Sequence, residues 1–169
     1  MEDLWSLKAS EISKLYLSNE ISLDEIINSV EERFNQVNPK INAIPESTFE
    51  YARKQAKLLD DNKKNNKPLG CLAGVPVTVK INTDQTGFAS TNGLRLNKSL
   101  IAHKNSTVVD NLEKAGALII GRTNTPAFSI RWFTKNSLHG HTFNPHNKKI
   151  TPGGSSGGAA SATASGIGC

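Results

Sequence analysis

The sequence predicts an α/β fold in which helices cover both faces of a sheet with parallel strands. Two apolar segments with strand character, 72–80 and 117–120, flank a segment whose apolar residues have helical spacing. Strand, helix and strand in this order are typical of a parallel βαβ unit. Three helical segments precede the unit, and a stretch rich in glycine and serine, 151–158, follows it.

The N-terminal part of the chain is expected to form three packing helices. Their apolar residues recur at helical spacing: Ile12, Leu15 and Tyr16 in the first, Ile26, Ile27, Val30, Phe34 and Val37 in the second, and Phe49, Ala52, Ala56 and Leu59 in the third. Ser22 and Glu25 form a capping box at the start of the second helix, which is expected to stop at Pro39. The third is expected to begin near Thr48 and to end before a solvated loop, 61–67, rich in lysine and asparagine.

The predicted βαβ unit has clear start and stop signals. The first strand, 72–80, alternates polar residues with three valines: Val75, Val77 and Val79. Ser106 can cap the following helix, and Gly116 suits the position just past its end. Because ligands of such sheets gather at the carboxyl ends of the strands, we expect a site where Lys80 ends the first strand and 121–126 leaves the second.

The composition argues against several classes of protein. The net charge is +5, but the lysines are dispersed and lack interleaved aromatic residues, so a nucleic-acid surface is not indicated. No apolar run approaches the ~20 residues of a membrane span, and the acidic start of the chain lacks the apolar region of a signal peptide. Cys71 and Cys169 fit a reducing compartment. We therefore expect a cytoplasmic protein.

Three histidines, His139, His141 and His146, lie in a segment with several aromatic residues, 128–147. Their spacing is conceivable for a metal patch, but no cysteine or carboxylate in the segment completes a set of ligands. We interpret them as surface or packing residues, and we expect no metal and no cofactor.

The glycine- and serine-rich stretch leads into small residues, 159–164, that are expected to begin a helix. Glycine allows close approach of the backbone, so the loop can set hydroxyl and N–H groups against another group. A flexible linker is one alternative, although a linker is rarely followed by such an apolar helix. A phosphate-binding loop is another, but no lysine follows the glycines as that motif requires.

Lys80 and the serine pair Ser155 and Ser156 suggest nucleophilic chemistry. A lysine at the end of an apolar strand can simply extend to solvent. Beside a serine loop, however, a neutral lysine can serve as the base that activates a hydroxyl. Working near neutral pH needs a pKa about 3 units below the usual value of about 10.4, which corresponds to ~4 kcal/mol. Burial can supply a shift of that size.

These residues belong to a wider pattern that resembles the amidase signature family. The resemblance covers nearly the whole chain and rests on five segments that stand in family order: 74–80, 90–93, 121–126, 140–145 and 152–162. It implies an α/β/α fold with a mixed sheet covered by helices. It also implies hydrolysis of a carboxamide by a Ser–Ser–Lys triad.

The resemblance also implies roles for individual residues. Lys80 corresponds to the lysine base, and Ser155 corresponds to the bridging serine, which follows a cis peptide bond and relays the proton. Ser156 is expected to support the loop by hydrogen bonding. Ser129 falls in the segment that lines the family's substrate pocket.

The third member of the triad is expected to lie outside this chain. In the family the acylated serine follows the bridging serine by roughly two dozen residues, and this sequence stops at Cys169. Residues 1–169 are therefore interpreted as the N-terminal portion of a single amidase domain. Within it, 1–66 is a helical packing segment and 67–169 begins the catalytic α/β core. We expect the chain alone to be inactive.

Two other functions stay open. The family also includes the glutamine-hydrolysing subunit of a tRNA-dependent amidotransferase, which usually carries a Met-Asp-Glu-Phe-like stretch where this chain has 126–132. That departure favours a stand-alone amidase with a small-molecule amide substrate, no nucleic-acid or membrane partner, and a full-length protein compatible with a homodimer. From another class, the chain could be a non-catalytic phosphate- or ligand-binding module.

Overall fold

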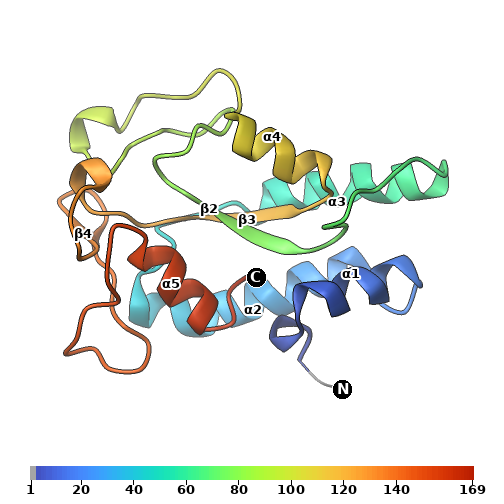
Figure 1. Cartoon of the computed structure of the whole chain (residues 1–169), viewed down its shortest axis with the longest axis horizontal. Coiled ribbons are helices and arrows are strands. Elements are labelled where there is room, and N and C mark those ends of the chain that lie inside the picture. Colours follow the sequence, from blue (N-terminus) through green and yellow to red (C-terminus); the bar gives the residue numbers. More distant parts are fainter. Residues whose placement is uncertain (1–2) are drawn as a thin grey trace.

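A three-stranded mixed sheet lies between helices in the computed structural model, which describes residues 3–169 (Figure 1). The strand order is β1 (Glu46–Ser47), β3 (Leu118–Thr123) and β2 (Pro76–Lys80). β2 and β3 are parallel, and β1 is antiparallel to β3. Helix α4 (Thr107–Lys114) connects the parallel strands, so the predicted βαβ unit and α/β fold are confirmed.

The N-terminal helices also form as predicted. They are α1 (Ala9–Leu17), α2 (Leu23–Ile41) and α3 (Phe49–Lys64), preceded by a short 3-10 turn at Leu4–Ser6. The predicted capping box is present: the Ser22 hydroxyl accepts from the Glu25 amide, and the Glu25 carboxylate accepts from the Ser22 amide at 2.8 Å.

Two predicted helix ends are wrong. Helix α2 runs through Pro39 to Ile41, because Asn42 ends it in a left-handed conformation and the Asn38 side chain accepts from the amides of residues 43 and 44. Within the last turn, proline costs little more than one backbone hydrogen bond. Helix α3 runs to Lys64, so residues 61–64 of the expected 61–67 loop are helical, since their polar side chains are tolerated on an exposed helix.

The strand limits differ from those predicted. β2 begins at Pro76 rather than at residue 72, because Gly74 has a φ of +79° and turns the chain before the strand. β3 continues to Thr123, past the apolar stretch that predicted it, and its last residues are buried despite their polarity. β1 was not predicted at all, since two residues carry no periodicity.

The sheet has a separate core on each face. On one face, α1, α2, α3 and α5 (Gly157–Ala164) share a large core with β3, which includes Ile26, Ile120 and Ala162. On the other face, α4 covers a smaller cluster around Val79, Val109 and Ile119. In Figure 1, α4 accordingly lies above the sheet and α1, α2 and α5 lie below it.

Helix α3 closes the outer side of β3 next to the short strand β1. The Thr48 amide, just before α3, donates to the Ile120 carbonyl at 2.9 Å. The Gln55 side chain of α3 accepts from the Ile119 amide at 2.8 Å. A helix therefore satisfies backbone groups that a longer neighbouring strand would otherwise satisfy.

The rest of the chain forms loops around the carboxyl ends of the strands. It contains 3-10 turns at Arg95–Asn97 and Ala127–Ser129 and a small antiparallel pair, β4 (Lys135–Asn136) and β5 (Gly140–His141). Helix α5 begins at Gly157, two residues before the predicted start. Across residues 3–169, none of the helices has the length and apolar character needed to cross a membrane.

Candidate active site

Lys80 and the two predicted serines meet at the carboxyl end of β2. The Lys80 Nζ atom lies 2.8 Å from Ser155 Oγ and 3.2 Å from Ser156 Oγ. Lys80 is the last residue of β2, and the serines directly precede α5, which packs on the same strand. The fold therefore brings together three side chains that are 75 and 76 residues apart in the sequence.

The surroundings of Lys80 favour its neutral form. Its side chain is partly buried, and this desolvation lowers the pKa of the amine below the ordinary lysine value. Within residues 3–169, no carboxylate forms a salt bridge with Lys80 that would oppose the shift. A lysine with a lowered pKa next to a hydroxyl can accept the hydroxyl proton.

Thr134 fixes the loop that carries the serines. Its hydroxyl donates to the Gly153 carbonyl at 3.0 Å and accepts from the Gly157 amide at 3.0 Å, so it joins both ends of the loop. The peptide bond between Gly154 and Ser155 is cis, as the family resemblance implied. Gly154 must be glycine, because a Cβ atom there would lie 2.5 Å from the Arg131 carbonyl oxygen.

Ser129, which the family resemblance placed in a pocket-lining segment, lines the same pocket as Ser155. Its hydroxyl is 2.8 Å from Thr125 Oγ1, and the Thr125 hydroxyl also reaches the backbone carbonyl of Ser155 at 3.2 Å. Asn92 Oδ1 accepts from Ser129 at 2.6 Å. Sequence reasoning missed Thr125, Thr134 and Asn92 as individual residues, although Asn92 and Thr125 each belong to a segment that carried the resemblance.

A shallow pocket of about 300 Å³ opens next to the serine loop. Its walls are Ser129, Ile130, Arg131, Trp132, Gly154 and Ser155. Ile130 and Trp132 are 74% and 88% exposed, so the pocket combines the Ser155 hydroxyl with apolar side chains and one cation. Such a combination suits a substrate that has an apolar part beside its reacting group.

The three histidines do not contribute to this cluster. His141 stacks on Phe143, with ring centroids 4.8 Å apart, and burial lowers the pKa of His139. In the part of the chain from residue 3 onward, no group of three or more His, Cys, Asp or Glu side chains is arranged to hold a metal ion.

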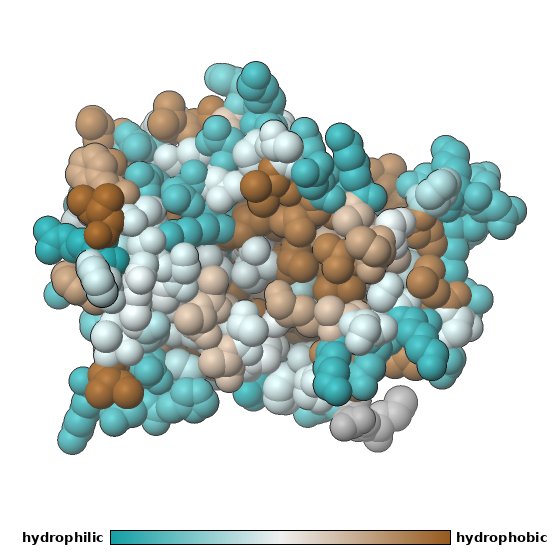
Figure 2. Space-filling model, viewed as in Figure 1, coloured by the Kyte–Doolittle hydropathy of each residue, from teal (hydrophilic) through white to brown (hydrophobic). Residues whose placement is uncertain are grey.

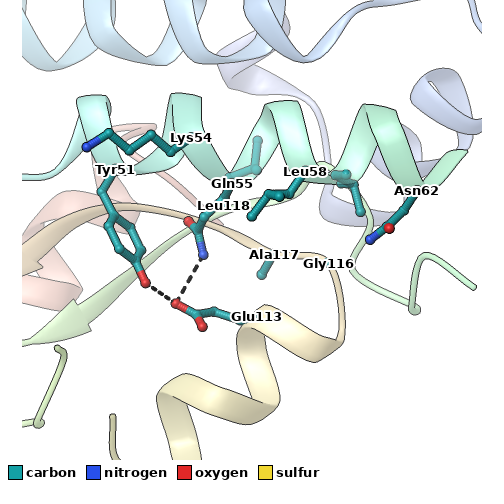
Figure 3. A pocket seen from close by; sticks show the side chains of 10 residues that line it. Tyr51, Lys54, Gln55, Leu58, Asn62, Glu113, Gly116, Ala117 and Leu118 are labelled. Carbon is teal, nitrogen blue, oxygen red and sulfur yellow. Dashed lines mark hydrogen bonds between the residues drawn. The ribbon is translucent and has the colours of Figure 1, made fainter. Parts of the chain in front are cut away.

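A second pocket, about 280 Å³, lies between α3 and α4 and is separate from Lys80 and the serines (Figure 3). Glu113 is its central polar group. The hydroxyl of Tyr51 and the amide of Gln55 both donate to this carboxylate, and the Asn105 amide donates to its other oxygen. These donors satisfy the carboxylate, so the cluster serves to join α3 to α4.

Comparisons of the sequence with protein families and with known proteins agree with one another. Residues 25–169 match the family described as Amidase. The chain is 45% identical over 165 residues to an indoleacetamide hydrolase of Bradyrhizobium diazoefficiens, with 98% of this chain and 32% of that protein covered. It is 40% identical over 162 residues to a subunit of the glutamyl-tRNA(Gln) amidotransferase of Fusobacterium nucleatum, with 96% of this chain and 33% of that protein covered.

Solved structures agree with these sequence matches. A bacterial aryl acylamidase of the amidase signature enzyme family superposes with a TM-score of 0.90 at 34% identity, covering 96% of this chain and 34% of that one. The α/β/α architecture with a mixed sheet is therefore that of amidase signature enzymes. The chain spans about a third of the length of the curated relatives that it matches.

Proposed function

The chain belongs to the amidase signature family, and from this premise we propose that it carries the base and the bridging serine of an enzyme that hydrolyses carboxamides. The observation that supports these roles is the 2.8 Å contact between Lys80 Nζ and Ser155 Oγ, together with the lowered pKa of Lys80. The two hydroxyls within reach of the amine differ in distance, which favours Ser155 over Ser156 as the relay.

The proposed reaction moves one proton along a chain of three groups. Neutral Lys80 accepts the proton of the Ser155 hydroxyl, and the Ser155 oxygen accepts the proton of a nucleophilic serine. The nucleophile attacks the carbonyl carbon, and the proton returns along the same path to the leaving nitrogen. An amine or ammonia departs, and water then releases the carboxylic acid from the acyl-enzyme by the same sequence of transfers.

We propose that the nucleophile lies beyond Cys169, in a polypeptide of the length of the curated relatives, termed the full-length enzyme below. The family resemblance supports this proposal, since it puts the acylated serine roughly two dozen residues after Ser155. The 169-residue chain alone should then release no product from any amide. Turnover by that chain that disappears in Lys80→Ala would contradict the proposal.

The adjacent serines offer a matched test in the full-length enzyme. Ser155→Ala should lower kcat by about 10²–10⁴-fold, the usual contribution of a group that transfers a proton in the transition state. Ser156→Ala should have a smaller effect, because its oxygen lies farther from Lys80. Equal kcat values for Ser155→Ala and the unmodified enzyme would refute the assigned relay.

For the substrate we propose a small amide with an apolar acyl group. The exposed Ile130 and Trp132 beside Ser155 support this choice, as does the relative named indoleacetamide hydrolase. The full-length enzyme should hydrolyse indoleacetamide with a higher kcat/KM than acetamide. Replacing Trp132 with Ala should reduce the difference in kcat/KM between the two substrates, because it should raise KM for indoleacetamide.

The alternative is glutamine hydrolysis within a tRNA-dependent amidotransferase, which is favoured by the 40% identity to one component of such an enzyme. Ile130 and Trp132 argue against it, because these side chains offer no polar partner to the two charged groups on the α-carbon of glutamine. Release of ammonia from glutamine at a higher kcat/KM than from indoleacetamide would support the alternative.

A further inference from the structure

The inference starts from two consecutive residues with an unusual backbone. Phe128 and Ser129 have φ values of +59° and +56°, a left-handed conformation that non-glycine residues rarely adopt. Pairs of this kind persist where the surrounding structure holds them, and they concentrate at functional sites. Here the backbone turn places the Ser129 hydroxyl against Thr125, at the pocket that Ser155 also lines.

The hydroxyl of Ser129 is fully used by the protein. It contacts Asn92 Oδ1 at 2.6 Å, Thr125 Oγ1 at 2.8 Å and Asn82 Nδ2 at 3.2 Å. Thr125 donates its one proton to the Ser155 carbonyl, so the single proton of Ser129 must serve both Thr125 Oγ1 and Asn92 Oδ1, while Asn82 Nδ2 donates to Ser129. Ser129 therefore has no proton left to donate to a substrate, although it lies on the pocket wall.

Thr125 connects Ser129 to the loop that carries Ser155. Its side chain is fully buried, and its hydroxyl lies between Ser129 Oγ and the Ser155 carbonyl oxygen. The backbone of Thr125 is itself held, since its amide donates to Asn124 Oδ1 and its carbonyl accepts from Asn136 Nδ2. Thr125 thus ties Ser155 to the end of β3 through a rigid support.

We propose that Thr125 and Ser129 are positioning residues that hold Ser155 in place for proton exchange with Lys80. This inference rests on the proposed amidase function. The contacts form a bridge that begins at Asn82 and Asn92, in the loop after β2. It continues through the hydroxyls of Ser129 and Thr125 and ends at the backbone carbonyl of Ser155. Because the same loop leaves β2 directly after Lys80, the bridge fixes the base and the relay relative to each other.

The energetic reason is the sensitivity of proton transfer to geometry. Ser155 sits in a glycine-rich loop, in which few side chains restrain the backbone. Without the Thr125 contact, the Ser155 carbonyl loses a side-chain donor and the loop can shift. A displacement of about 1 Å at a reacting group costs up to roughly 10²-fold in rate.

The test uses substitutions at Thr125 in the full-length enzyme. Thr125→Val keeps the shape but removes the hydroxyl, and it should lower kcat by about 10- to 100-fold with little change in KM. Thr125→Ser retains a hydroxyl and should recover most of the loss. Thr86→Val is the matched control, because Thr86 is exposed and its side chain makes no contact with the site.

Two substitutions at Ser129 separate positioning from backbone strain. Both Ser129→Ala and Ser129→Gly remove the hydroxyl, but glycine adopts the left-handed conformation readily. Positioning through the hydroxyl predicts a similar loss of kcat in both variants. Full activity in Ser129→Gly would overturn the proposal, because it would show that only the backbone conformation matters.

Crystal structures of Thr125→Val and of the unmodified enzyme give a readout that does not depend on turnover. We expect the contact between Lys80 Nζ and Ser155 Oγ to lengthen beyond hydrogen-bonding range in the variant. An unchanged contact would overturn the inference. Failure of the unmodified enzyme to hydrolyse any amide would instead refute the proposed function, and the structures would still decide the positioning role.

Discussion

At the scale of single residues, Lys80 is the group on which the proposed chemistry depends. A lysine acts as a base only when it is neutral, and burial at the end of β2 favours that form. Its two neighbours within hydrogen-bonding distance are hydroxyls, which neither neutralise nor repel the charged form strongly. Desolvation therefore sets the direction of the pKa shift.

This direction predicts how activity depends on pH. Since the pKa of Lys80 is lowered, kcat/KM of the full-length enzyme should rise with pH through an apparent pKa below the ordinary lysine value of about 10.4. Below that pKa the amine is protonated and cannot accept the Ser155 proton. The measurement is a pH–rate profile with a neutral amide substrate.

The control for this profile is Lys80→Arg, which keeps a positive charge at every accessible pH. Its residual rate should not show the rise attributed to Lys80. An apparent pKa at or above the ordinary lysine value would contradict the prediction, as would the same rise in the arginine variant.

Lys80, Ser155 and Ser156 could be proposed from the sequence because they lie in the segments that carry the family resemblance. Thr125 and Thr134 were not predicted, since their roles come from partners that only folding brings near. Thr134 contacts Gly153 and Gly157, and Thr125 contacts Ser155, 30 residues later in the chain. A threonine in a loop gives no local signal of such contacts.

At the scale of elements, helix α5 must approach the end of β3 closely. A Cβ atom on Gly158 would lie 2.5 Å from both the amide nitrogen and the carbonyl oxygen of Asn124. These are backbone atoms that cannot move aside without displacing the strand end. The helix that follows Ser155 and Ser156 is therefore held at a separation that only glycine permits.

Gly158→Ala should consequently lower the free energy of unfolding by about 1–3 kcal/mol, the usual cost of overpacking. Gly87→Ala is a matched control, because Gly87 has a φ of +85° and nothing within 4 Å of an added Cβ. It should cost only the backbone strain, about 1 kcal/mol. Denaturant unfolding measures both, and equal stability of Gly158→Ala and the unmodified protein would contradict this account.

Strand β3 contains a buried arginine that organises the loop after β2. Arg122 is completely buried, with its Nε atom 2.8 Å from Glu46 Oε2. Its guanidinium donates to Gln85 Oε1 at 3.2 Å and to the Ala89 carbonyl at 3.0 Å. Burial lowers the pKa of Arg122, while the Glu46 carboxylate opposes this shift. These contacts link β1 to the 81–89 loop.

Arg122→Met should destabilise the protein by about 3–5 kcal/mol, because it leaves buried acceptors without their donor. Arg53→Met is the matched control, since the salt bridge from Arg53 to Glu31 is partly exposed and should contribute about 1 kcal/mol or less. The measurement is urea unfolding of both variants. Similar losses of unfolding free energy in the two variants would show that the burial of Arg122 does not determine how much it stabilises the protein.

The elements predicted best were those with long periodic patterns. Helices α1 to α4 and the two parallel strands follow from apolar spacing and caps, whereas β1 and the exact end of α2 do not. The register shift between Val77 and Thr78, opposite which Ile120 of β3 is an extra residue, is likewise absent from any local pattern, since it depends on how β2 and β3 pair. Local sequence patterns predict whether a segment forms a helix or a strand better than they predict how the strands pair.

At the scale of the whole molecule, the helical segment and the α/β segment share one core. Ile26 of α2, Ile120 of β3 and Ile167 after α5 belong to the same buried cluster. A hydrogen bond of 2.7 Å from Arg33 Nε to the Ser165 carbonyl joins the two segments at the surface of that core. The division into residues 1–66 and 67–169 thus reflects sequence composition. The described residues of the two segments pack in one continuous core.

The side of β2 that faces away from β3 differs from this shared core. Figure 2 shows apolar side chains gathered at the centre of this view, over the region where Figure 1 shows β2 and α4. Val108 of α4 is 60% exposed, and the Cys169 amide donates to the Pro76 carbonyl at 2.9 Å on the side of β2 away from β3. The chain therefore returns to this strand after α5.

The shared core predicts that distant parts of the molecule unfold together. Ile26→Ala removes a fully buried side chain from α2 and should cost about 2–5 kcal/mol. Because the core is continuous, amides in both α2 and β3 should lose the same protection free energy in native-state hydrogen exchange. Leu58→Ala, at a side chain that is 67% exposed on α3, should change neither set by more than about 0.5 kcal/mol. Loss of protection confined to α2 would show instead that the helical segment opens independently, and that the strands carrying Lys80 and Arg122 are stable without it.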